Sequence, residues 1–201
     1  ALLDHTNNSG VSGNRATYLH LFSGTILLLL FIFNDHSLLP DLPDYINYFN
    51  VIGETPWREL VNIRKYIYIK EDYGFIYSFK IIHSLFDSEI FLFAVIGVFI
   101  IFSYLYFVRM FSTGILSPIF FYLAYSFYEN LFLIRQSIAV GILLISLKFL
   151  VQQRKLRFFT MICVAFTFHQ TSIVMLLVLL MDSLKNYRQL IGVTSVVIIL
   201  G

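Results

Sequence analysis

Six apolar runs, separated by polar segments, set the pattern of the chain. Five of them approach or reach the roughly 20 residues that a helix needs to cross a bilayer, and we predict a transmembrane helix for each. These five runs cover residues 18–33, 90–108, 115–131, 135–151 and 158–181. The sixth run stops at residue 201 after about a dozen residues. We therefore expect a truncated sixth helix, in a chain that is a fragment of a longer protein.

A long polar region, residues 34–89, separates the first run from the second. Within it, residues 73–86 are apolar but too few to span, and Lys80 and His83 interrupt them. We predict an interfacial or re-entrant helix there. The pattern as a whole predicts an all-α polytopic membrane protein. It would be a single integral-membrane domain over residues 1–201, with about five full spans, the truncated sixth and one long loop.

Composition supports this class. Hydrophobic residues make up 58% of the 201 residues and charged residues 13%, whereas soluble domains carry about 25% charged residues. The net charge of +2, without a basic stripe between aromatic residues, gives no indication of nucleic-acid binding. Cys163 is the single cysteine, so no internal disulfide is predicted.

Basic residues near the ends of the spans predict an orientation. Arg15, Arg109 and the cluster at 154–157 fall on one side if residues 73–86 do not cross. Since loops rich in lysine and arginine stay in the cytoplasm, the region 34–89, with nine acids against five bases, is expected outside.

Arg135 and Gln136 open the fourth predicted span, six residues after Glu129. An arginine cannot lose its proton and costs about 2.5–3.5 kcal/mol at mid-bilayer. Arg135 could snorkel to the interface or form a salt bridge with Glu129. It could also bind a phosphate or pyrophosphate together with the helix N-terminus, to which Gln136 would add neutral donors.

His169 lies inside the fifth predicted span, where Ala165 and Ser172 would share its helical face. It could be a structural histidine bonded to a neighbouring helix. Alternatively, it could accept or donate a proton, because imidazole titrates near pH ~6.5.

Asp41 and Asp44 follow prolines in the long loop. They could be turn and capping residues, with Asp44 capping a helix that starts at Tyr45, or Asp44 could act as a base. The sequence has no glycine-rich phosphate loop, no His-Glu-x-x-His and no Cys-x-x-Cys. No metal site and no cofactor are predicted.

Four stretches resemble one known family: "DYINYFN", "EDYGFIYSFKIIHSLF", "LIRQSIAVGILLISLKFLVQQRK" and "CVAFTFHQTSIVMLLVLLM". The most specific elements are Ile-Arg-Gln-x-x-Ala at 134–139 and Phe-His-x-Thr at 168–171. Over residues 41–181 the chain resembles the EpsG-like family of bacterial polysaccharide polymerases, relatives of the Wzy O-antigen polymerases. It departs at Asp72, where members tend to have proline, and at "LLPDLP", which replaces an Arg-Gly-type lead-in before the "DY" element.

The resemblance implies a multi-pass glycosyltransferase of the bacterial cytoplasmic membrane. It would join polyprenyl-diphosphate-linked oligosaccharide repeat units into an O-antigen, capsule or exopolysaccharide at the outer face. Its partners would be the lipid-linked oligosaccharide and the bilayer, and could include chain-length regulator and flippase proteins.

The resemblance also implies roles for individual residues. Arg135 would stabilise the leaving diphosphate, and the base would be His169 or, second, Asp44. The residues expected to contact substrate are Gln136, Glu71, Tyr128 and Gln170. Two other classes remain open: a flippase or transporter of the lipid-linked oligosaccharide, and a membrane glycan acyltransferase.

Overall fold

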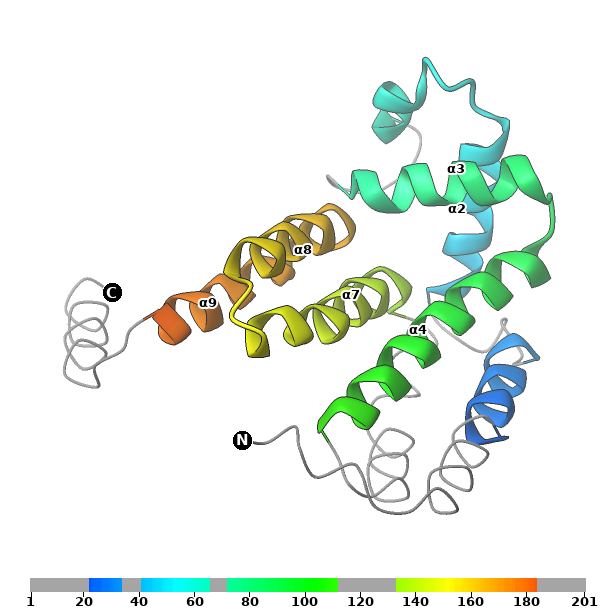
Figure 1. Cartoon of the computed structure of the whole chain (residues 1–201). Coiled ribbons are helices and arrows are strands. Elements are labelled where there is room, and N and C mark those ends of the chain that lie inside the picture. The colour runs from blue at the N-terminus through cyan, green and yellow to red at the C-terminus, as the bar shows by residue number, and fades with distance from the viewer. Residues whose placement is uncertain (1–21, 34–40, 66–71, 112–132, 184–201) are drawn as a thin grey trace.

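The computed structural model describes residues 22–33, 41–65, 72–111 and 133–183, and these form helices without any strand (Figure 1). After a first helix, Phe22–Ile32, the elements are α2 (Leu42–Glu54), η2 (Leu60–Lys65), α3 (Tyr73–Leu85), α4 (Glu89–Phe111), α7 (Ile134–Val151), α8 (Lys155–Phe168), η4 (Gln170–Val174) and α9 (Met175–Ser183).

Two of these helices, α4 and α7, are long and apolar enough to cross a membrane. They confirm the helices predicted at 90–108 and 135–151. The first predicted span contains the helix Phe22–Ile32, which is shorter than a full crossing. The predicted span at 115–131 and the truncated sixth lie outside the described residues.

The prediction of one continuous helix over 158–181 is wrong. Helix α8 ends at Phe168, His169 is extended (φ −158°, ψ 126°), and the chain continues through η4 into α9. Residues at the break have poor helix propensity, because threonine is β-branched and competes for backbone hydrogen bonds. The Thr167 hydroxyl, for example, donates to the carbonyl of Val164 at 2.7 Å.

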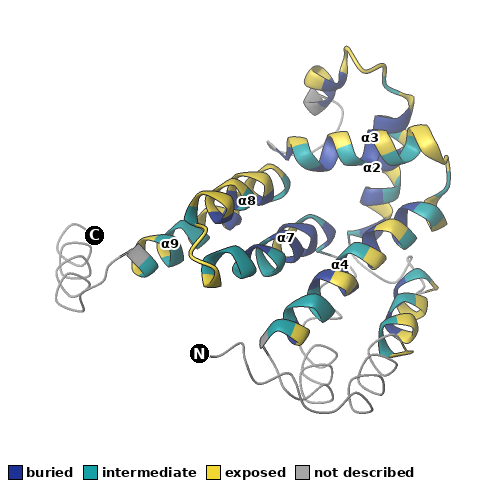
Figure 2. Cartoon of the chain, viewed as in Figure 1, coloured by how far each residue is buried: buried dark blue, intermediate teal, exposed yellow. Residues whose placement is uncertain are grey.

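Within the region 34–89, the described residues hold α2 and η2 in addition to the one short helix that the sequence predicted there. Its helices α2 and α3 supply much of the hydrophobic core, and their facing sides are buried (Figure 2). Phe49 and Phe79 meet with ring centroids 5.8 Å apart, and Phe75 and Phe79 with centroids 3.9 Å apart. The short helix predicted at 73–86 is present as α3, packed on this core.

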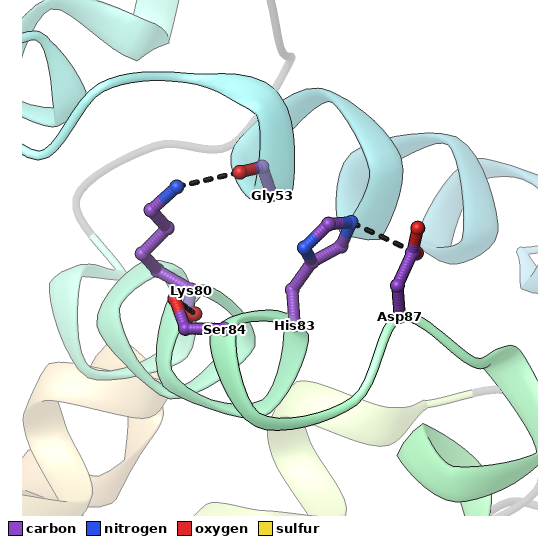
Figure 3. A network of polar contacts seen from close by, with 5 residues as sticks. All are labelled: Gly53, Lys80, His83, Ser84 and Asp87. Carbon is purple, nitrogen blue, oxygen red and sulfur yellow. Dashed lines mark hydrogen bonds and ion pairs between the residues drawn. The ribbon is translucent and has the colours of Figure 1, made fainter.

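Polar contacts connect the C-terminal end of α2 to the second half of α3 (Figure 3). The buried Lys80 ammonium donates to the carbonyl of Gly53, in the last turn of α2, at 2.5 Å. The carbonyls in the last turn of a helix have no N–H donor within the helix, and the helix dipole favours a cation there. His83 packs against Gly53, where a Cβ would overlap its ring, and pairs with Asp87 at 3.0 Å.

Helix α7 packs between α4 and α8. Gly141 permits the α4 contact, since a Cβ there would lie 2.9 Å from Phe99. Helix α3 packs against α8, and a Cβ on Gly74 would overlap the Thr167 hydroxyl. The start of α3 therefore meets the end of α8, on the side where α7 begins (Figure 1).

Candidate functional site

Arg135, the second residue of α7, joins three segments of the chain. Its Nη1 pairs with Oδ2 of Asp72, immediately before α3, at 2.6 Å. Its Nε donates to the hydroxyl of Tyr45, in α2, at 3.4 Å. The guanidinium thus connects residues 63 and 90 positions away along the sequence.

The two partners of the ion pair differ in exposure. The Asp72 side chain is 4% exposed and that of Arg135 is 29% exposed. A carboxylate this buried requires a cationic or hydrogen-bonding partner. Asp72 occupies the N-cap of α3 but makes no side-chain capping bond, so its carboxylate is directed to Arg135. Glu129, the partner considered from the sequence, lies outside the described residues.

Two tyrosines of α2 lie within the electrostatic reach of Arg135. Burial raises the pKa of Tyr45, and the hydrogen bond from Arg135 opposes that rise. Burial also raises the pKa of Tyr48. The charge of the Asp44 carboxylate raises it further, and the charge of Arg135 lowers it. Asp44 and Arg135 therefore have opposite effects on the pKa of the Tyr48 phenol.

The capping role predicted for Asp44 is wrong. Helix α2 begins at Leu42, and Asp41 takes the N-cap without a side-chain bond. Pro43 fits the first turn because its missing N–H would have no acceptor within the helix. Asp44 consequently lies inside the helix with an exposed side chain.

Gln136 follows Arg135 in the first turn of α7, and its side chain is exposed. Leu133 at the N-cap offers no capping side chain. The first N–H groups of a helix carry its positive dipole end, so Arg135 and Gln136 lie where an anion is favoured.

His169 lies at the break between α8 and η4 and is partly buried. Its backbone N–H donates to the carbonyl of Ala165 at 3.0 Å, while its imidazole has no hydrogen bond to the described residues. The shared face with Ala165 and Ser172 was predicted for a continuous helix and is wrong, because the helix stops here. Phe168, next to it, contacts Gly74, two residues from Asp72. His169 and Arg135 thus approach the start of α3 from two helices.

Three predicted substrate contacts remain. Gln170 in η4 is exposed, and Glu71 and Tyr128 are not among the described residues. The described residues hold no group of three metal-ligating side chains. Tyr45 and Asp72 were not predicted as partners of Arg135. The available signal in the sequence was the carboxylate at Asp72, where family members tend to have proline.

Gly74→Ala should destabilise the protein by about 1–3 kcal/mol, because the methyl would overlap the Thr167 hydroxyl and lie 2.9 Å from the Phe168 ring. Gly24→Ala is the matched control, since its Cβ would meet the flexible end of Leu105 at 2.9 Å. Thermal unfolding in detergent compares them. Equal unfolding temperatures for both variants would contradict the tight α3–α8 contact.

Three comparisons relate the chain to known proteins. The model of the EpsG family matches residues 18–201, while no curated protein and no solved structure matches the chain. The match covers every stretch on which the resemblance rested and confirms it. With two helices fit to cross a membrane, it indicates a membrane protein of polysaccharide biosynthesis. The chain belongs to the EpsG family.

Proposed function

We propose that the chain is the polymerase of a surface polysaccharide. It is a multi-pass glycosyltransferase that joins polyprenyl-diphosphate-linked oligosaccharide units at the outer face of the bacterial cytoplasmic membrane. The observation that carries this proposal is Arg135, fixed by Asp72 and Tyr45 at the start of α7 yet 29% exposed. Family membership supports a polymerase of the glycosyltransferase type.

The leaving group explains why such an arginine is needed. When the glycan leaves its carrier, the bond from its anomeric carbon to the diphosphate breaks and the diphosphate gains a negative charge. A guanidinium carries five N–H donors, and the contacts with Asp72 and Tyr45 engage two of them. A cation that is already oriented stabilises the developing charge without reorganisation.

The acceptor hydroxyl supplies the other half of the reaction. Its oxygen bonds to the anomeric carbon, and its proton passes to a base. His169 is the first candidate, because its imidazole has no hydrogen bond to the described residues and lies at a helix break close to the start of α3. Asp44, exposed in α2, is the second. Gln136, Glu71, Tyr128 and Gln170 are proposed substrate contacts.

Arg135→Ala should abolish polymerisation, with a rate loss of about 10²–10³-fold, the scale for removing one transition-state donor. The full-length protein would be expressed in a host lacking its own copy. The surface glycan is separated by size on a gel, and the protein level is checked by immunoblot. We expect single repeat units in place of a ladder. Arg135→Lys should be a poor substitute, because lysine cannot make bidentate contacts.

Arg109→Ala, an exposed arginine in the last turn of α4, is the matched control and should keep the ladder. A normal ladder from Arg135→Ala would refute its proposed role. Loss of surface glycan altogether, single units included, would instead favour a flippase. A dependence on acyl donors with the ladder intact would favour a glycan acyltransferase.

His169→Ala should insert and accumulate normally yet fail to extend the glycan beyond the first units, because the acceptor hydroxyl would lack its base. Full activity of His169→Ala would remove His169 from the mechanism and leave Asp44 as the candidate.

A further inference from the structure

The two residues of the ion pair differ in exposure, so only one of them is open to a ligand. Asp72 is 4% exposed and Arg135 is 29% exposed, so a ligand can reach the arginine while the carboxylate stays covered. A ligand at this site therefore contacts Arg135, and Asp72 can act on it through the ion pair with Arg135.

Asp72 is itself held firmly. Its carbonyl accepts the N–H of Ile76 at 3.2 Å in the first turn of α3. Phe75 and Ile76 of that turn are buried in the core. The carboxylate makes no capping bond and lies 2.6 Å from Nη1 of Arg135. The packing of α3 therefore determines where the guanidinium lies.

Orientation alone is a substantial effect for this side chain. A free arginine side chain samples many rotamers, and this conformational entropy must be lost when the guanidinium engages a phosphate. The Asp72 contact restricts Arg135 before the substrate arrives, and geometry held in advance favours the transition state.

The negative charge of Asp72, in contrast, weakens the binding of the substrate diphosphate. Its carboxylate neutralises Arg135 and competes with phosphate oxygens for the same donors. A diphosphate that already carries its negative charge in the ground state is bound less tightly for that reason. The further charge that appears when the glycosidic bond breaks still meets an oriented cation.

We propose that Asp72 is a positioning residue that weakens ground-state binding of the diphosphate and strengthens stabilisation of the transition state by holding Arg135. This inference rests on the proposed polymerase function. It predicts a specific kinetic result: without the carboxylate, the substrate binds more tightly and reacts more slowly.

The test is the steady-state kinetics of Asp72→Asn in the full-length protein, reconstituted in lipid vesicles. The substrate is the lipid-linked repeat unit extracted from a host lacking the polymerase, and the readout is the initial rate of glycan extension. We expect kcat to fall about tenfold or more and KM to fall severalfold, since about 1.4 kcal/mol corresponds to a tenfold change. Asp72→Glu, which keeps the charge, should restore part of kcat.

Asp182→Asn is the matched control, because it breaks another ion pair, with Lys155 at 2.9 Å, away from the site. It should leave kcat and KM unchanged. If Asp72→Asn fails to fold, Asp72→Glu becomes the test. Its longer carboxylate displaces the guanidinium, so kcat should fall below the wild-type value. The unfolding temperature should stay close to that of the wild type.

Other outcomes overturn the inference. A rise in KM for Asp72→Asn would mean that Asp72 only maintains the fold or assists binding. Unchanged kinetics, in a protein where Arg135→Ala abolishes the ladder, would refute the role of Asp72 and leave the polymerase proposal intact. If neither Asp72→Asn nor Arg135→Ala affects glycan extension, the polymerase mechanism itself is contradicted.

Discussion

The ion pair between Arg135 and Asp72 constrains everything around it. A carboxylate that is 4% exposed cannot remain charged without a partner, and α7 supplies that partner from its first turn. The start of α3 must therefore face the start of α7. Gly74, two residues further along, allows the end of α8 close to the same point. The ion pair and this close contact thus bring the first turn of α7 and the last turn of α8 to the same end of α3.

The remaining contacts keep that junction in place. At its far end α3 is fixed to α2 by the buried Lys80 and by packed aromatic rings. Helix α7 is fixed between α4 and α8. Core packing transmits position well because interiors are dense and resist deformation. A site that must hold a guanidinium in one orientation gains from being built on such rigid elements.

Sequence patterns predicted the elements whose signal is local. The apolar runs predicted α4 and α7, and the short run at 73–86 predicted α3. The core role of α2 was missed because its buried residues, Leu42, Tyr45, Phe49 and Ile52, alternate with polar ones in a proline-containing segment. Their spacing of three and four residues was the available helical signal. Hydropathy averaged over a whole span could not predict the break at His169, because the short polar stretch at residues 170–172 lies between longer apolar runs. The partnership of Asp72 with Arg135 spans 63 residues, and no local pattern encodes it.

The proposed mechanism requires that Arg135 bind a diphosphate. The most direct measurement is the binding of polyprenyl diphosphate to the full-length protein in nanodiscs, with polyprenyl monophosphate as the comparison ligand. For Arg135→Gln we expect about tenfold or greater loss of affinity for the diphosphate, the scale of one charge-assisted contact, with a smaller loss for the monophosphate. Equal affinity of wild type and Arg135→Gln for the diphosphate would contradict the account.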